Sequence, residues 1–345
     1  MLKEIVLSGI GVVSPFGVGA DALLSGLLER RKTFRSGKPF RGNGAVPDFD
    51  PSAYVPNDLR RLSRPSLFAV VAAHEALRRA GRFPVPQPSR TSIFVATCHG
   101  AIAFSESFHR SLVTQGPASV SPSTFSESLF NVAASHISIT LGITGPAITV
   151  VGDGTRFHGL LRQASAALAA GEIDIALVGA VEEDHPILRE GYGTCDPRVA
   201  GRLQRAGGRG GESPLCEGSV VAVLERAETA KKALARISVL PPSPLSPSPS
   251  PFSDFVLPSG SLNREWTDDE SPIVPSPDRT LGVRPLVGEA FELMGGLQLA
   301  AGAALMERDP GVPAVRAWNV SPVTRRLGTF GLVSFRRPSP GGPDE

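Results

Sequence analysis

One stretch of the sequence places a tight turn between a buried strand and a helix, a common position for a catalytic nucleophile. Residues 147–151 are apolar and β-branched, and Gly152-Asp153-Gly154-Thr155 is a turn signal. The apolar residues that follow recur at helical spacing, and Thr155 can cap that helix. The free N–H groups and the dipole at such a helix start favour an anion, such as a thiolate. The turn contains no cysteine, however, and its only hydroxyl is that of Thr155.

Other nucleophilic or basic side chains lie near this turn in sequence or follow a neighbouring strand. Cys98 and His99 come directly after a strand predicted at 91–96, but adjacent side chains on an extended chain point apart. They therefore form a poor nucleophile–base pair, and a structural role is the simpler interpretation. His158 lies four residues after Gly154, facing either the protein interior or solvent. If the turn carries a different chemistry, its pocket would use Asp153, Thr155, His158 and Cys98.

The composition is that of a globular protein without an obvious cofactor. The chain has 345 residues, of which 41% are hydrophobic and 20% charged. Its formal charge of +2 implies neither a nucleic-acid nor an acidic-membrane partner. Three widely spaced cysteines suggest reduced thiols in a cytoplasmic protein, with no disulfide or metal pattern. The N-terminal apolar run is too short to span a membrane, and its Gly9-Ile10-Gly11 lacks the third glycine of a dinucleotide site.

The periodicity predicts an α/β chain with a proline-rich interruption. We predict strands at 4–10, 91–96, 147–151, 173–181, 220–224 and 328–335, with Gly9 and Gly11 breaking the first. We predict helices at 21–31, 66–80, 104–113, 129–141, 155–170, 228–236 and 288–307. The sequence divides into a first part at 1–240, a Pro/Ser-rich linker and irregular segment at 241–278, a last folded part at 279–336 and a disordered tail at 337–345. Residues 241–258 are expected to be exposed and mobile.

Four segments, in order, resemble the β-ketoacyl synthase family. They are VLSGIGVVSPFGVG, SLFNVAASHISITLGITGPAITVV, AAGEIDIALVGAVE and CEGSVVAVLERAETAKKALARI. The resemblance covers residues 3–238 well and 279–335 weakly. It implies a thiolase-like fold, in which two related halves stack as layers of helix, sheet, helix, sheet and helix. The second half of this chain would then be shortened.

The resemblance also implies where the family's catalytic residues would stand, and none of them is present. The family's acyl-accepting Cys corresponds to Gly154. In the K-x-x-x-G-H-T motif the Lys corresponds to Arg284 and the second His to Glu289. The first His falls near Pro258-Ser259-Gly260-Ser261, which has no imidazole. No histidine follows His185, although both family histidines lie in the second half.

The resemblance further implies a dimer in which the strand at 147–151 pairs across the axis, beside residues 131–141. We expect its interface to include a small set of residues: Asn131, His136, Ala147, Thr149 and Val151. The favoured hypothesis is a non-catalytic subunit, similar to a chain-length factor, that pairs with an active ketosynthase or with itself and meets an acyl carrier protein.

Two alternatives remain open. One is an acyl transferase or thioester hydrolase that uses different residues of the same fold. The other is an acyl- or carrier-protein-binding module, in which an acidic carrier protein would meet an arginine-rich loop. That loop contains Arg189, Arg198, Arg202, Arg205 and Arg209.

Overall fold

The computed structural model describes most of the chain: residues 3–33, 44–56, 59, 62–152, 154–194, 215–239, 256–258, 283–287, 289–309, 312, 314–320 and 327–334. Its strands are β1 (Ile5–Ser14), β2 (Gly17–Val18), β3 (Thr91–Thr97), β4 (Ala147–Val151), β5 (Ile175–Glu182), β6 (Gly218–Arg226), β7 (Ala235–Val239), β8 (Val256–Pro258), β9 (Ala314–Val320) and β10 (Leu327–Ser334). Its α-helices are α1 (Ala20–Leu28), α2 (Arg64–Arg79), α3 (Ile102–Gln115), α4 (Pro122–Glu127), α5 (Val132–Leu141), α6 (Arg156–Ala170), α7 (Pro186–Thr194), α9 (Arg284–Val287) and α10 (Phe291–Arg308).

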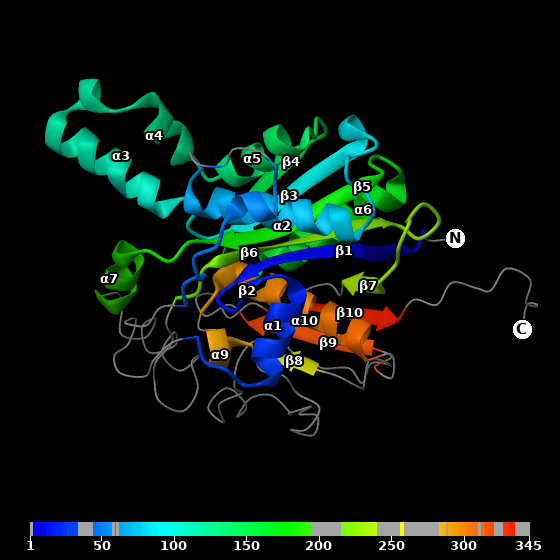
Figure 1. Cartoon of the computed structure of the whole chain (residues 1–345). Coiled ribbons are helices and arrows are strands. Elements are labelled where there is room, and N and C mark those ends of the chain that lie inside the picture. The colour runs from blue at the N-terminus through cyan, green and yellow to red at the C-terminus, as the bar shows by residue number, and fades with distance from the viewer. Residues whose placement is uncertain are drawn as a thin grey trace, which may run out of the picture.

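The described strands hydrogen-bond into one mixed sheet in the order β4-β3-β5-β6-β1-β7-β10-β9-β8, with β2 beside β1. The pairs β3–β4 and β3–β5 are parallel, and β3 and β5 are buried along their whole lengths, as their continuous apolar sequences predict. The expectation that residues 147–151 form a buried strand was wrong, because β4 lies at the edge of the sheet and its residues are half-buried or exposed. Strands of the first and last parts of the chain meet where β7 pairs with β10 over five residues. The last part of the chain therefore extends the sheet of the first part (Figure 1).

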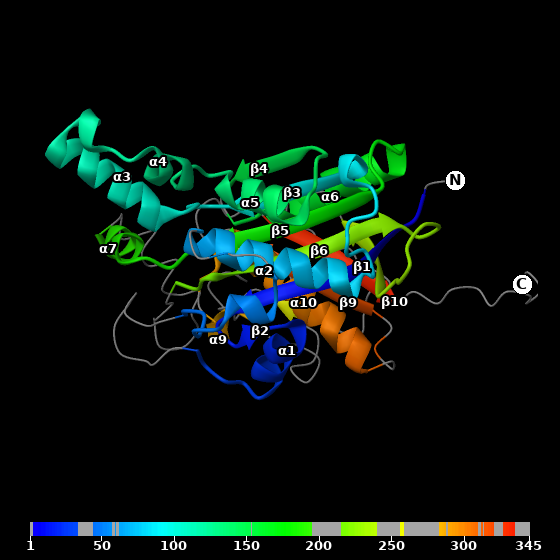
Figure 2. The same cartoon turned by 45° about the horizontal axis from the view of Figure 1, so that its top comes forward.

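Helices α6 and α10 are enclosed between the two ends of the sheet. α10 contacts β5 and β6 on one side and β9 on another. Every residue of α10 from Phe291 to Leu305 is buried, and a helix that is buried all round must lie between layers. α2 and α5 cover the opposite face of the first strands, whereas α3 and α4 form an arm that projects from the body (Figure 2).

Glycines in β1 permit a close approach of helix and strand. The strand runs unbroken through Gly9 and Gly11, so the prediction that these residues end it was wrong. A Cβ at Gly9 would lie 2.2 Å from the carbonyl oxygen of Ala76, and one at Gly11 would lie 1.9 Å from that of Ala72. Both carbonyls belong to α2, which therefore packs directly on the β1 backbone. The glycines serve helix–strand packing here.

Two further expectations differ from the structure. Residues 228–236 were predicted to be helical, but 227–234 form turns and β7 begins at Ala235. Pairing of β7 with β1 and β10 outweighs the helix propensity of this lysine-rich segment. Within the predicted mobile linker, Val256–Pro258 forms β8, which pairs with β9 in parallel. Residues 241–255 lie outside the described residues.

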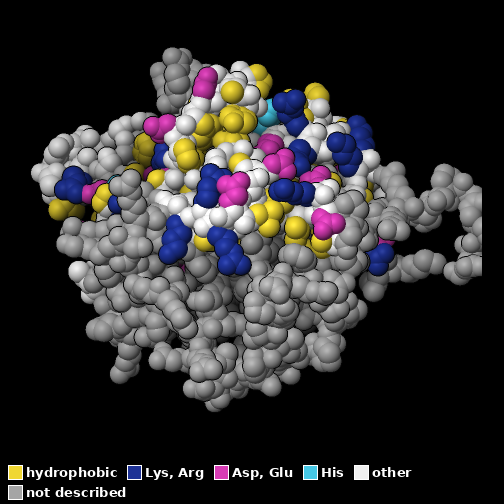
Figure 3. Space-filling view, turned by 60° about the horizontal axis from the view of Figure 1, so that its bottom comes forward, with side chains coloured by type: hydrophobic (Ala, Val, Ile, Leu, Met, Phe, Trp, Pro, Cys, Tyr) yellow, Lys and Arg dark blue, Asp and Glu magenta, His cyan; other side chains and the backbone are white. Residues whose placement is uncertain are grey.

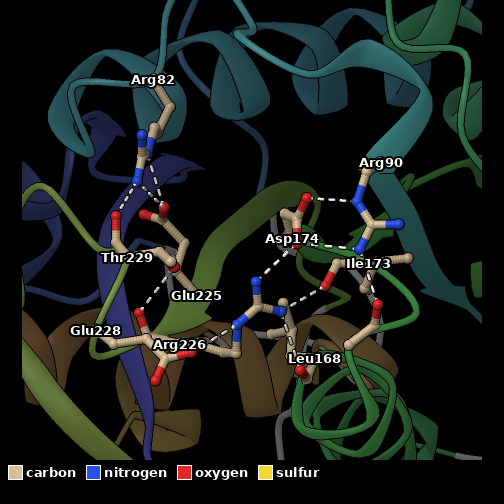
Figure 4. A network of polar contacts seen from close by, with 10 residues as sticks. Arg82, Arg90, Leu168, Ile173, Asp174, Glu225, Arg226, Glu228 and Thr229 are labelled. Carbon is tan, nitrogen blue, oxygen red and sulfur yellow. Dashed lines mark hydrogen bonds and ion pairs between the residues drawn. The ribbon is translucent and has the colours of Figure 1, made fainter.

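A polar network, buried at Arg226 and exposed at Arg90, fixes the end of the sheet nearest the α2 C-terminus (Figure 4). Arg226 donates to the carbonyls of Leu168 and Ile173 and to Asp174, which also accepts from Arg90. The network thereby joins β6 to the end of α6 and to the loop before β5. Arginine suits this position because its fork of donors can satisfy several acceptors at once.

On the face shown in Figure 3, the described residues carry interspersed charges of both signs. In the described part of the chain, no helix combines the length and apolar character that crossing a membrane requires.

Candidate functional site

The turn between β4 and α6 holds an anion, and that anion is a side chain of α10. Glu292 accepts a hydrogen bond from the amide of Gly154 at Oε1 (2.8 Å) and from that of Phe157 at Oε2 (2.9 Å). Gly154 has a φ of +101°, a conformation that favours glycine. The Glu292 side chain is fully buried. Free N–H groups at the start of α6 therefore meet a carboxylate, in agreement with their electrostatic preference.

Of the other residues expected at this turn, one lies at the start of the helix, one faces the interior and one lies outside the described residues. Thr155 occupies the N-cap position of α6 but makes no side-chain capping bond, so the predicted cap is replaced by Glu292. His158 faces the interior, where α10 comes close enough that a Cβ on Gly295 would lie 2.7 Å from the imidazole Cε1. Burial lowers the pKa of His158 to about 4. Asp153 lies outside the described residues.

Cys98 and His99 lie at the end of β3, beside this turn, and point to different partners. The Cys98 thiol donates to the carbonyl of Gly152 (3.0 Å). Burial, reinforced by the nearby carboxylates of Glu182 and Glu292, raises the pKa of the Cys98 thiol far above its usual range. The thiol is therefore protonated at neutral pH and is a poor nucleophile. This disfavours the acyl-transfer chemistry that was considered for Cys98.

His99 forms a hydrogen-bonded chain with an acidic and an aromatic residue. Its Nδ1 lies 3.1 Å from Oε2 of Glu182, and its Nε2 lies 2.8 Å from the Tyr192 hydroxyl. Because a carboxylate accepts, Nδ1 donates to Glu182, and the Nε2 of an imidazole in its neutral form accepts from Tyr192. The Phe291 ring packs on His99 and stacks with Tyr192, at centroid distances of 4.7 and 5.3 Å. The imidazole is thus held within the fold, as the structural interpretation predicts.

The residues that correspond to the family's second His motif lie in α9 and directly before α10. Glu289 is fully buried, and its Oε1 accepts from the amide of Phe291 (2.8 Å). Its backbone forms a bridge with Leu215, and its carbonyl accepts from the amide of Cys216 (2.8 Å). Arg284 begins α9, but its side chain lies outside the described part, as do Ser259, Gly260 and Ser261.

A second group of buried carboxylates lies near the base of the projecting arm. Burial raises the pKa of Glu183 to about 7, even though Glu183 accepts from the amide of Ala103 at the start of α3 (3.2 Å). Glu217 is paired with Arg64, whose Nε and NH2 both donate to it. The expectation that Arg189 lies on an arginine-rich loop was wrong, because Arg189 is part of helix α7, where it pairs with Asp184. The other arginines of that expected loop, at positions 198, 202, 205 and 209, lie outside the described residues. Within the described residues, no three His, Cys, Asp or Glu side chains are placed to hold a metal ion.

The expected dimer strand, β4, lies at one edge of the sheet. Among the described strands it pairs only with β3, and its end residues Ala147 and Val151 are exposed. Ile139 of the adjacent α5 is 77% exposed. Asn131 is the N-cap residue of α5 and is exposed, whereas Nε2 of His136 lies 2.5 Å from Oε1 of Glu127 in α4.

Several residues of the site escaped the sequence analysis. Glu292, Glu182, Tyr192 and Phe291 were not singled out, and Glu292 stands 138 positions from the amide that it binds. The sequence did contain one signal: the start of a helix favours an anion, but the turn before this helix has no cysteine that could supply a thiolate. Only the packing of α10 on α6 brings Glu292 to it.

Comparison with known proteins now identifies the family. The model of the "Beta-ketoacyl synthase, N-terminal domain" matches residues 2–230. The chain belongs to the β-ketoacyl synthase family. It is 26% identical over 253 residues to 3-oxoacyl-[acyl-carrier-protein] synthase 2 of Vibrio harveyi, covering 68% of this chain and 60% of that protein. It is 32% identical over 203 residues to a putative polyketide β-ketoacyl synthase 1 of Streptomyces halstedii, covering 54% of this chain and 47% of that protein.

These alignments span about 60% or less of the two curated relatives. Solved ketosynthase structures resemble the whole fold. One is the ishigamide ketosynthase/chain length factor, with a TM-score of 0.77, 19% identity and coverage of 96% of this chain and 100% of that chain. Another is a type II polyketide acyl-carrier protein in complex with its ketosynthase, with a TM-score of 0.78, 16% identity and coverage of 97% and 100%. The predicted thiolase-like α/β fold is therefore confirmed.

Proposed function

We propose that the chain is a non-catalytic ketosynthase-like subunit that pairs with an active β-ketoacyl synthase in chain elongation of the fatty-acid or polyketide type. The main support for this proposal is the identity of the residue at the start of α6. Gly154, which stands at the family's nucleophile position, has no side chain to accept an acyl group. Condensation also needs donors for a developing oxyanion, and the family's imidazole donors are replaced.

The proposed pairing surface is the edge of the sheet at β4 together with α5. An edge strand presents unpaired backbone groups and normally pairs with another chain or is covered. Val151 and Ile139 add exposed apolar surface beside this edge. The ishigamide ketosynthase/chain length factor, which resembles this chain in fold, supports a ketosynthase as the kind of partner. The complex of a ketosynthase with its acyl-carrier protein, which also resembles this chain in fold, supports a carrier protein as a second partner.

The alternative of a different acyl-transfer enzyme has less support. The Cys98 thiol is protonated at neutral pH, and the His158 ring faces the packed interior. Neither therefore supplies an activated nucleophile in this structure. No observation favours the binding-module alternative over a subunit role.

Co-expression with a cysteine-bearing β-ketoacyl synthase tests the proposal. We expect the two chains to co-purify at a stoichiometry of about one to one, and condensation of acyl and malonyl groups on a carrier protein to require the partner's cysteine. The isolated chain should show no condensation above a reaction without protein. Turnover by the isolated chain at the rate of an ordinary ketosynthase would refute the non-catalytic assignment.

A further inference from the structure

We infer that Glu292 is a built-in ligand of the anion site at the start of α6 and keeps that site closed to acyl groups. This inference shares one assignment with the proposed function, namely that position 154 corresponds to the family's nucleophile. It gives a second reason for a lack of condensing activity. The chain lacks the nucleophile, and the carboxylate of Glu292 also occupies the backbone amide donors beside that position.

The contacts of Glu292 are those of a bound ligand. Each carboxylate oxygen accepts from a different amide of the α6 start, Gly154 or Phe157, so both donors are occupied together. A Cβ on Gly152 would lie 2.2 Å from Oε1 of Glu292. The turn therefore leaves room for this carboxylate because residue 152 has no side chain. The Glu292 side chain is fully buried, so its contacts are shielded from solvent.

The occupied amides are of the kind that acyl-transfer enzymes use. Backbone N–H groups aimed at a developing oxyanion supply a large part of the rate in such reactions. An acyl carbonyl oxygen that approached position 154 would have to displace a buried, hydrogen-bonded carboxylate. A neutral carbonyl oxygen is a weaker acceptor than a carboxylate. The closed site is therefore expected to exclude acyl thioesters even if a thiol is restored.

The packing of α10 on α6 holds Glu292 in place. Gly295 lies three residues after Glu292, and a Cβ there would meet the Phe157 ring at 2.9 Å. The glycine thus allows α10 to approach α6 closely enough for Glu292 to reach the amides. Removing the carboxylate should therefore open the donors without moving the helices far.

The first test introduces a thiol beside the carboxylate. We would compare Gly154→Cys with the double variant Gly154→Cys/Glu292→Gln and measure alkylation by iodoacetamide across pH 6–10. The alkylation is followed on the peptide that contains residue 154 by mass spectrometry, because loss of Glu292 also lowers the pKa of the Cys98 thiol. Loss of the neighbouring charge should lower the pKa of the thiol by at least about one unit, which gives about tenfold faster alkylation at pH 7. Gly154→Cys/Glu307→Gln is the matched control, because Glu307 lies on the same helix but pairs with Arg79 at the surface. Equal rates with and without Glu292 would overturn the inference.

The second test needs no cysteine, which matters because the φ of Gly154 disfavours a side chain. Glu292→Ala leaves the amides without their ligand, and formate or acetate should refill the site. We expect 100 mM formate to raise the Tm of Glu292→Ala by about 2 °C or more and to leave the parent chain and Glu307→Ala unchanged. An equal response of all three proteins to formate would contradict the inference. Because neither test includes a ketosynthase, failure here leaves the proposed pairing untouched, and failure to pair leaves this inference intact.

Discussion

At the scale of single residues, the interior carries ionisable groups whose protonation is set by burial. His158 is the clearest case, because burial lowers the pKa of its imidazole to about 4 and so favours the neutral ring. The unfolded chain binds this proton near pH 6.5, whereas the folded chain binds it only near pH 4. His158 therefore contributes stability above about pH 6.5 that is lost as the pH falls towards 4.

We predict that acidification from pH 6.5 to 4 costs the parent chain more stability than it costs His158→Gln. A pKa difference of this size corresponds to on the order of 3 kcal/mol of unfolding free energy. Urea unfolding of both proteins at several pH values measures the difference. The comparison between variants is needed because Glu183, whose folded-state pKa is raised to about 7, changes stability in the opposite direction over part of this range. Parallel pH curves for the two proteins would show that the imidazole is not buried as described.

Gly11 supports a second prediction at this scale. A Cβ there would lie 1.9 Å from the Ala72 carbonyl oxygen, a distance that only movement of α2 can relieve. We therefore expect Gly11→Ala to reduce the unfolding free energy by about 3 kcal/mol or more, or to prevent folding. Gly159→Ala is the matched control, because a Cβ there meets nothing within 4 Å and should be tolerated. Thermal unfolding of both variants distinguishes the two outcomes.

At the scale of secondary-structure elements, β4 and α5 form the apolar edge proposed for pairing. We predict that Ile139→Asp combined with Val151→Asp weakens association at least about tenfold, because two charges would be desolvated in the interface. The monomer's stability should change little, since both side chains are exposed in this structure. Analytical ultracentrifugation or co-purification with a ketosynthase measures the loss.

The control for this prediction is Leu28→Asp, which introduces a charge at an exposed apolar residue of α1, at a distance from β4 in Figure 1. It should leave association unchanged. Thr149→Pro gives a more disruptive test, because proline cannot donate to a strand ladder. Intact association of the Ile139/Val151 variant would place the interface elsewhere.

At the scale of the whole molecule, the network of Figure 4 holds separate segments of the chain together. Arg82, just beyond α2, donates to the fully buried Glu225 of β6 (2.7 Å) and to the carbonyl of Thr229. Removing the arginine would leave a buried carboxylate without its charge partner. We predict that Arg82→Ala lowers the unfolding free energy by about 3–5 kcal/mol. Arg110→Ala, which breaks an exposed pair within α3, should leave the unfolding midpoint nearly unchanged in the same denaturant series.

The amino-acid sequence by itself determined much of this architecture. Most strands and helices of the first part followed from periodicity, although α4 and α7 were not predicted and residues 228–236 were wrongly predicted to be helical. The order of four segments predicted the family that the comparisons then established. The absence of any histidine after His185 also needed no structure, because a count of residues is independent of folding. The turn at 152–155 was correctly predicted to favour an anion, since that preference is local to the start of a helix.

Only the tertiary structure decided which side chain binds at the start of α6 and which segments become strands. The anion at α6 is Glu292, which lies far away in sequence and is delivered by α10. Gly9 and Gly11 lie within a continuous strand because α2 packs on their backbone, and residues 235–239 form a strand because β1 and β10 pair with them. In the two strands, a contact between distant segments outweighs a local preference of about 1 kcal/mol or less per residue. Local patterns report such preferences, whereas the choice of partner depends on the packing of the whole chain.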